Sequence, residues 1–277
     1  MQSVLARLEE RGITASPLAE EWQAITDATP DEEEFCIAAA RIGLDPYSLP
    51  TDLALLLERA AVDLEPRLLA DFLDAVNPSE LQVELDWVKK TSKEIEDLVA
   101  QPSATIETLR SQLLERPEVA FGAPWRGYDQ ARRVREVVGL APTEQFQAHD
   151  LMTCRESPLK AHGLQALGGT TRSGGETLVL SRQYVDEAKR FASARALWHF
   201  VHDAASDRFL LTSRHGDRQR VARAFAAELL APADGIRELL GDGSDVASEE
   251  DIDQVAAAFG VSSFVVGHQI TNQLTSV

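Results

Sequence analysis

One short stretch of this sequence gathers five candidate metal ligands. His199, His202 and Asp203 lie within five residues of one another, and His215 and Asp217 follow shortly after. Imidazole nitrogens and carboxylate oxygens are ligands that zinc prefers, and histidines three residues apart share one face of a helix. A zinc ion held by three or four such groups could activate water for hydrolysis. The ordinary alternative is that His202 and Asp203 end a helix and that the other two residues flank a turn.

The helix that carries His199 has the spacing of a hydrolytic zinc motif without its chemistry. That motif, His-Glu-x-x-His, holds the metal with two imidazoles one turn apart, and its glutamate takes a proton from the bound water. The matching positions here are Arg195, Ala196 and His199. A guanidinium repels a metal cation and alanine cannot act as a base. We therefore expect no catalytic residue and no metal on this helix, and His199 to be a hydrogen-bonded, partly buried histidine.

Arg195 lies among apolar side chains, so its charge needs a partner if the residue is buried. The carboxylates that we expect to supply it are Glu228 and Asp217. Such a pair would place an internal cation where a hydrolase holds its metal.

Composition argues against several classes of partner. Acidic residues exceed basic ones by 45 − 27 = 18, and a net charge of −18 repels nucleic acid and anionic membranes. No apolar run is long enough to span a bilayer and no signal peptide opens the chain. Cys36 is expected in a core and Cys154 at the surface as a free thiol. We expect a cytoplasmic protein.

The elements that must position these residues differ between the two halves of the chain. Residues 1–118 have apolar side chains at helical spacing and predict a helical N-terminal region. Turn-forming residues cluster at 117–125, and residues 119–277 are expected to form the second domain. Within it, 163–169 and 176–181 are short and apolar, with a glycine-rich turn between them that predicts a β-hairpin. The predicted fold class is α+β, mainly helical, with a small sheet.

From about Pro124 onward, the chain resembles the ImmA/IrrE family of metallopeptidase-like proteins. The resemblance rests on segments in the family's order. These are the opening helix PWRGYDQARRVREVVGL, the strand TLVLS, the segment RFASARALWHFVH, the helix RQRVARAFAAELLAP and the closing pair VAAAFGVSSFVVGHQITNQL. The resemblance implies a zincin-like domain in which TLVLS is the edge strand and the sheet packs on the degenerate helix.

The resemblance fails at the catalytic positions. The family's first metal histidine falls on Arg195, its glutamate on Ala196, its second histidine on His199 and its third, acidic ligand on Gln219. Some relatives read Arg-Ala-Leu in place of His-Glu-Leu, and this sequence looks like that branch. The resemblance therefore implies a member that keeps the scaffold and has lost the chemistry.

These observations favour a catalytically silent, metallopeptidase-like protein that regulates or senses by binding a protein partner and needs no cofactor. The resemblance implies that the protein acts together with repressors, or takes part in stress responses, toxin–antitoxin systems or defence. A first alternative is an active zinc peptidase that uses His199 with His202, or with His215 and Asp217, as non-standard ligands.

A second alternative is a DNA-binding regulator. Ala256, Gly260 and Val266 have the spacing of a helix-turn-helix, but the segment SSFVVGHQITNQL contains no lysine or arginine to neutralise phosphate. A structural helical hairpin, with no DNA-binding residue, is the preferred interpretation. The densest basic run in the chain is expected to be an exposed helix face paired with nearby acids rather than a phosphate site; it comprises Arg126, Arg132, Arg133 and Arg135.

Overall fold

The computed structural model describes residues 2–13, 16–114, 122–203, 207–241 and 248–275. The chain divides into two compact units, residues 1–62 and 63–277. The domain boundary predicted between residues 118 and 119 lies outside the described residues.

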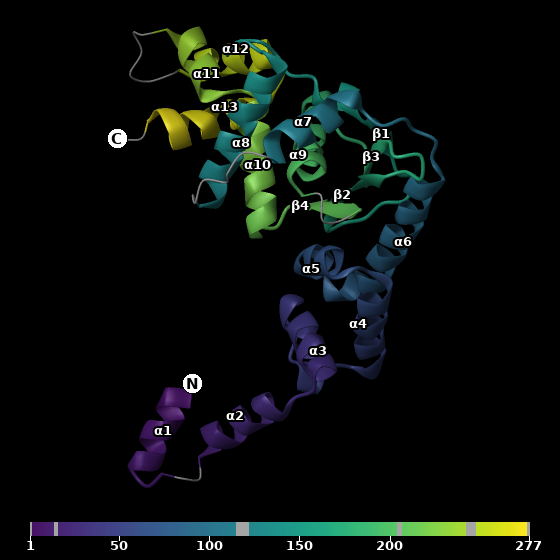
Figure 1. The fold of residues 1–277 in the computed structure, drawn as a ribbon, viewed down its shortest axis with the longest axis vertical. Coiled ribbons are helices and arrows are strands. Elements are labelled where there is room, and N and C mark those ends of the chain that lie inside the picture. The colour runs from purple at the N-terminus through teal and green to yellow at the C-terminus, as the bar shows by residue number, and fades with distance from the viewer. Residues whose placement is uncertain (1, 14–15, 115–121, 204–206, 242–247, 276–277) are drawn as a thin grey trace. The chain divides into compact units, whose positions relative to one another are not determined.

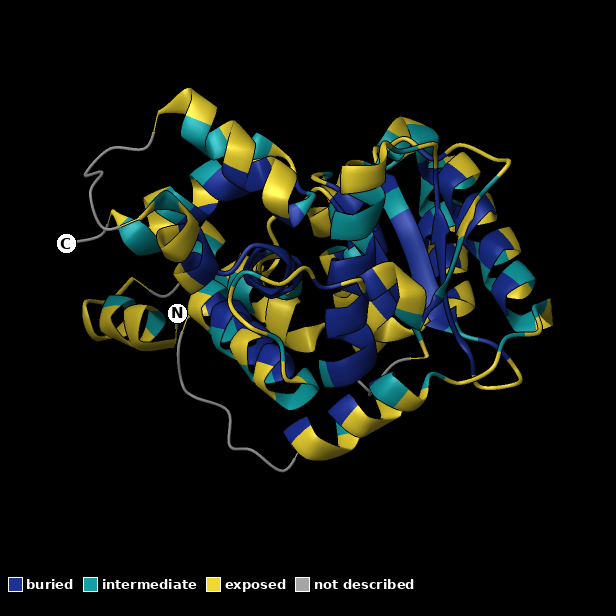
Figure 2. Ribbon diagram, turned by 90° about the horizontal axis from the view of Figure 1, so that it is seen from above, coloured by how far each residue is buried: buried dark blue, intermediate teal, exposed yellow. Residues whose placement is uncertain are grey.

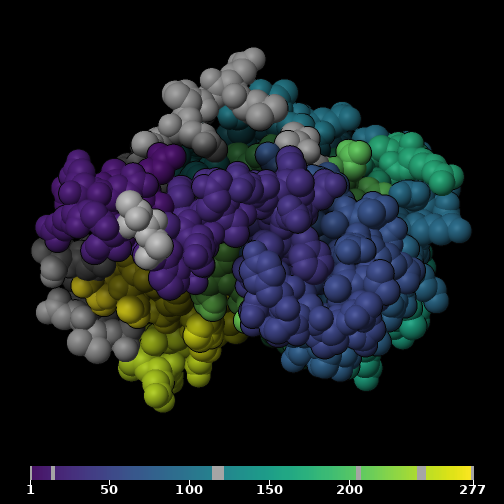
Figure 3. Space-filling model, turned by 90° about the horizontal axis from the view of Figure 1, so that it is seen from below, coloured from purple at the N-terminus to yellow at the C-terminus, as the bar shows by residue number. Residues whose placement is uncertain are grey.

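The first unit consists of helices joined by short turns. They are α1 (Gln2–Glu10), α2 (Pro17–Asp27), α3 (Pro30–Arg41), the 3₁₀ turn η1 (Pro46–Ser48) and nearly all of α4 (Thr51–Asp63). A capping box begins α3, because the Thr29 hydroxyl accepts from the Glu32 amide while the Glu32 carboxylate accepts from the Thr29 amide. No residue of α1 or α2 is buried, and their side chains lie at the surface (purple in Figure 3).

The second unit surrounds a small sheet with helices. Before the 115–121 gap it contains α5 (Pro66–Ala75), η2 (Pro78–Glu80), α6 (Leu81–Asp97) and α7 (Ala104–Leu114). After the gap come α8 (Ala123–Val138), η3 (Ala148–Leu151), α9 (Asp186–His202), α10 (Asp217–Leu230), α11 (Ala233–Leu240), α12 (Glu249–Phe259), α13 (Ser263–Gln269) and the π-helical turn η4 (Ile270–Leu274). This arrangement confirms the mainly helical α+β class.

Four strands of the described chain form one mixed sheet in the order β1-β3-β2-β4 (Figure 1). They are β1 (Thr153–Glu156), β2 (Leu164–Thr170), β3 (Glu176–Leu180) and β4 (Arg208–Thr212). The predicted hairpin is confirmed, since β2 and β3 pair antiparallel and Gly174 adopts a φ of +88° in their turn. The expectation that TLVLS is an edge strand is wrong. β3 is buried at all five positions and lies between β2 and the parallel strand β1, whose polar sequence gave no sign of a strand.

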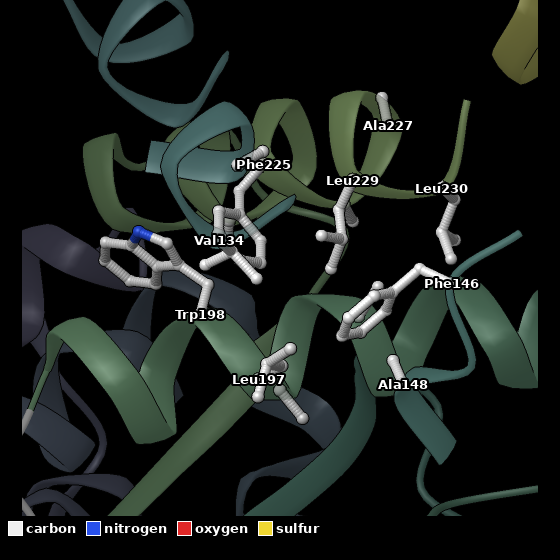
Figure 4. Close-up of a cluster of buried hydrophobic side chains, with 14 of the residues drawn as sticks. Val134, Phe146, Ala148, Leu197, Trp198, Phe225, Ala227, Leu229 and Leu230 are labelled. Atoms are coloured by element: carbon white, nitrogen blue, oxygen red, sulfur yellow. The ribbon is translucent and has the colours of Figure 1, made fainter. Parts of the chain in front are cut away.

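Helix α9 runs through the core of this unit. It packs against the sheet and against α7 and α10, and α10 in turn packs closely on α8. Figure 4 shows Val134 of α8, Leu197 and Trp198 of α9 and Phe225 of α10 among the apolar side chains that join these helices. Strands β2, β3 and β4 and the middle of α9 are mostly buried (dark blue in Figure 2), whereas no residue of β1 is. The predicted packing of the sheet on this helix is therefore confirmed.

No helix in the described ranges is both long enough and apolar enough to cross a bilayer.

Candidate functional site

Arg195, Ala196 and His199 lie in the buried middle of α9. Every residue from Ser193 to Val201 is buried. Small side chains at several of these positions let the helix approach the sheet and α10 closely. The three positions of the degenerate motif therefore face the protein interior.

The Arg195 guanidinium is held by three neutral oxygens. Nη1 donates to Oε1 of Gln165 at 2.6 Å, and Nη2 donates to the Thr212 carbonyl at 2.9 Å and to Oε1 of Gln219 at 2.6 Å. Burial and the neighbouring charge of Arg223 lower the pKa of Arg195 to about 9. The side chain is therefore still a cation at neutral pH, and it joins α9 to β2, β4 and α10.

Gln219 organises the other side of this cluster. Its Nε2 donates to the Leu210 carbonyl at 2.8 Å, and its Oε1 accepts from the Thr212 amide at 3.2 Å as well as from Arg195. An amide side chain supplies both the donor and the acceptor that these groups need, which a carboxylate would not. Gln219, at the position that matches the family's third ligand, therefore holds the guanidinium in place by hydrogen bonding.

The expectation that Glu228 or Asp217 pairs with Arg195 is wrong. Glu228 lies near the far end of α10, where its Oε1 accepts from Nε of Arg132 at 2.7 Å. Asp217 is exposed at the first residue of α10 and lies 3.6 Å from Nη2 of Arg126. Neither carboxylate faces α9 at the level of Arg195, so neutral oxygens take the role that we had assigned to an anion.

His199 is the surviving ligand candidate, and packing accounts for most of its surroundings. Its ring stacks on Phe209 with centroids 4.3 Å apart, and its Nδ1 lies 3.2 Å from Oδ2 of Asp203. Burial lowers the pKa of His199 to about 4, against the opposing effect of Asp203. The imidazole is therefore neutral at physiological pH. Nε2 has no hydrogen-bond partner among the described residues.

Asp203 belongs to a charged cluster rather than to a metal site. It accepts hydrogen bonds from Nη1 of Arg67 at 2.9 Å and from Arg218, whose Nη1 also lies 3.1 Å from Oδ2 of Asp71. Burial opposes ionisation of Asp203, but His199 and Arg218 lower its pKa overall. Burial raises the pKa of Asp71 to about 6. Asp71 is on α5, and no pattern in the sequence connected it with residues more than 120 positions away.

The other two ligand candidates are scattered. The His202 ring stacks on Trp198 and meets Phe225 edge-on, and burial lowers its pKa to about 4. His215 is exposed beside the start of α10. Within the described ranges, no three histidine, cysteine, aspartate or glutamate side chains are placed to hold a metal ion.

The side chains around His199 do not fit zinc. A zinc site needs three or four nitrogen, oxygen or sulfur ligands converging on one point. Here Nε2 of His199 and Nε2 of His202 are the buried imidazole nitrogens without a partner among the described residues, and no third ligand side chain is placed with them. The preceding motif positions present a guanidinium and a methyl group. The oxygen of Gln219 that could face a metal already accepts from Arg195.

In the C-terminal hairpin a tight turn joins α12 and α13, and Gln269 of the second helix is turned inward. Gly260 makes the turn between α12 and α13 with a φ of +63°. Gln269 is fully buried, and its Nε2 donates to Glu228 Oε2 at 2.7 Å and to the Ala231 carbonyl at 3.0 Å. A side chain held in this way cannot reach a base edge in a DNA groove.

The arginines of α8 also serve the fold. Arg135 is buried and donates to the Leu229 carbonyl at 2.8 Å, while Arg133 lies 2.7 Å from Asp129. Arg132 and Arg126 pair with carboxylates of α10, as described above. Three of the four arginines are therefore paired with nearby acids, as expected, whereas Arg135 is buried on main-chain carbonyls instead of lying on the exposed face.

Residues 147–271 match the family model of the IrrE N-terminal-like domain, Peptidase_M78. The match covers the sheet, α9, α10 and the C-terminal hairpin, and it begins after α8. No curated protein matches the chain.

Proposed function

This chain carries an IrrE N-terminal-like domain of the ImmA/IrrE family, and from that premise we propose that it is a catalytically silent member that regulates or senses by binding a protein partner. The observation that carries the proposal is the guanidinium of Arg195, hydrogen-bonded to Gln165, Thr212 and Gln219. A cation fixed in this place excludes a second cation by charge and by volume. The scaffold then remains as a rigid surface without a hydrolytic centre.

The absence of a base supports the same proposal. Ala196 stands where a glutamate would take the proton of a metal-bound water, and it is fully buried in the core cluster. Asp203, the carboxylate closest to His199 in sequence, is engaged by Arg67 and Arg218. A group already satisfied by two guanidinium donors is a poor proton acceptor.

Exposed apolar side chains of the first unit support a role in partner binding. Val4 of α1 is 48% exposed and Ile25 of α2 is 63% exposed. Amphipathic helices with uncovered apolar residues commonly gain stability by packing against another protein. We propose that α1 and α2 contribute to the partner interface.

Zinc content and proteolysis test the catalytic half of the proposal. After incubation with zinc and removal of free ions, the wild-type chain should retain far less than one zinc ion and cleave no peptide. A variant with Arg195→His, Ala196→Glu and Gln219→Glu regains the ligand set of a zinc hydrolase and should take up about one zinc ion. Stoichiometric zinc in the wild type that is lost in His199→Ala would instead establish the active-peptidase alternative.

Crosslinking in cells that produce the full chain tests the partner. The same partner should crosslink to the wild type and to His199→Ala, because binding does not require chemistry. Ile25→Asp should weaken the crosslink, whereas Glu21→Asp, a conservative change at an exposed residue of the same helix, should not. A crosslink that depends on added zinc, or no specific crosslink at all, would contradict the proposal.

A further inference from the structure

Two arginines meet at the end of β4 with no carboxylate between them. The Thr212 carbonyl accepts from Nη2 of Arg195 at 2.9 Å and from Nη1 of Arg223 at 3.1 Å. Nη2 of Arg223 donates to the Arg214 carbonyl. Within the described residues, every hydrogen-bond acceptor of these two guanidinium groups is therefore a neutral oxygen.

Arg220 adds a third positive charge to this pair. Burial and then the charge of Arg220 lower the pKa of Arg223. Burial and then the charge of Arg223 lower the pKa of Arg195. Arg195 is buried, Arg223 is partly buried and Arg220 is exposed, so the three charges run from the interior to the surface. We call these three residues the arginine cluster.

The arginine cluster differs from other arginines of this unit because it lacks a carboxylate partner. Arg126, Arg208 and Arg218 each form an ion pair with an acidic side chain. No arginine of the cluster forms such a pair within the part of the chain that the structure describes. Asp71 raises the pKa of Arg195, but this carboxylate already lies 3.1 Å from Nη1 of Arg218.

An uncompensated group of like charges costs free energy. Neighbouring cations repel one another, and the repulsion grows where burial removes water. The chain as a whole has 18 more acidic than basic residues, yet none of these acids is paired with the cluster. A carboxylate from outside the chain would relieve the repulsion and accept from the unused donors of Arg220 and Arg223.

We infer that the arginine cluster receives an acidic segment of the protein partner, with a carboxylate of that segment bound by Arg220 and Arg223. The fork of donors on arginine suits a carboxylate, and the buried charge of Arg195 adds to the attraction. A short acidic segment fits better than a nucleic acid, since a net charge of −18 repels a long polyanion. This inference rests on the proposed binding of a protein partner and names the chemistry of the partner.

Binding of a labelled acidic peptide provides the first measurement. Fluorescein-labelled hexaglutamate is titrated with the full chain at low ionic strength and followed by fluorescence anisotropy, with labelled hexaglutamine as the neutral probe. Only hexaglutamate should bind, and added sodium chloride should weaken its binding. Failure of hexaglutamate to bind in a saturable way would overturn the inference.

Variants locate the peptide. Arg220→Gln and Arg223→Gln should each raise the Kd for hexaglutamate about threefold to fivefold, as expected for exposed or half-exposed ion pairs. Arg237→Gln removes the same charge from an exposed position of α11 and should leave the Kd unchanged. Arg223 also bonds two main-chain carbonyls, so Arg220→Gln keeps the test valid if the other variant fails to fold. Equal Kd values for wild type and Arg220→Gln would overturn the inference.

Two further outcomes separate the alternatives. Oligodeoxythymidine that binds more tightly than hexaglutamate, and loses affinity in Arg220→Gln, would replace the acidic protein segment by a nucleic acid. Crosslinking in cells distinguishes this inference from the proposed function. A specific partner whose crosslink is as strong in Arg220→Gln as in wild type would preserve the proposed function and contradict the acidic segment. The absence of any partner would contradict both.

Discussion

Arg195 is an unusual buried cation because its partners carry no charge. Transfer of a guanidinium into the interior is costly, and an ion pair is the common remedy. Here the side-chain oxygens of Gln165 and Gln219 and a main-chain carbonyl share the charge. Gln219 is the most connected of them, since it also bonds Leu210 and Thr212. The stability of the site should therefore depend on this glutamine more than on any carboxylate.

Gln219→Leu tests that dependence. The change removes one acceptor from the buried cation and leaves the Leu210 carbonyl without its side-chain donor. We expect the free energy of unfolding to fall by about 3–5 kcal/mol, as when one partner of a buried charged group is removed. Urea denaturation measures it. Gln254→Leu, at an exposed position of α12, should change stability by less than about 0.5 kcal/mol. Equal effects at the two sites would disprove this role for Gln219.

His202 should make the stability of the fold depend on pH. Burial lowers its pKa to about 4 from an ordinary 6.5. Between these values the unfolded chain binds more protons than the folded one, so stability rises with pH and is lost as the pH falls. His199 acts in the same direction, while Asp71, with a pKa raised to about 6 from 3.8, acts in the opposite one.

Replacing the ring isolates the contribution of His202. His202→Phe keeps an aromatic ring between Trp198 and Phe225 but cannot be protonated. The slope of stability against pH between about 4 and about 6.5 should fall by about 1 kcal/mol per pH unit. His215→Gln, at an exposed histidine, should leave the slope unchanged. Denaturation curves at several pH values in this range measure the slope. Equal slopes for His202→Phe and wild type would show that His202 does not contribute to the pH dependence of stability.

Among the described elements, α8 and α10 share an extensive helix–helix contact. A Cβ atom built on Gly127 would lie 2.5 Å from the Val221 carbonyl and 2.8 Å from the Cβ of Ala224. Neither neighbour can move without shifting α10. Gly127 therefore sets the distance between the helix that carries Arg132 and the helix that carries Gln219 and Glu228.

Gly127→Ala should force the two helices apart. We expect a loss of about 1–3 kcal/mol, typical of overpacking in a core, although alanine favours helix. Gly267→Ala on α13 is the matched control, since nothing lies within 4 Å of the added methyl group there. That change should be neutral or stabilising by up to about 1 kcal/mol. Thermal denaturation of both variants measures the difference, and a harmless Gly127→Ala would show that the contact can relax.

Sequence patterns predicted the helices and strands better than the contacts between them. The hairpin and the helices followed from periodicity and glycine placement, whereas the sequence left open whether Arg195 is buried. The partners of Arg195 could not be predicted, because Gln165 and Thr212 come from strands whose register depends on the whole sheet. The sequence did not predict β1, because this segment is polar. It forms a strand because it pairs with β3. For the same reason Cys154 was expected at the surface, whereas it is half-buried.

At the scale of the molecule, residues 147–271 match a metallopeptidase-like domain, and several of its buried polar groups hold elements of the fold together. The hydrogen bonds of Gln219, Glu228 and Gln269 all hold elements together. The proposed role in binding relies on this use of polar groups for structure.

Diffraction from zinc-soaked crystals of the full chain, with data collected at the zinc absorption edge, tests the central claim most directly. The account predicts no anomalous peak beside Nε2 of His199, and density for the Arg195 guanidinium between Gln165, Thr212 and Gln219. An anomalous peak within bonding distance of that nitrogen, with Arg195 displaced from its three oxygens, would contradict it.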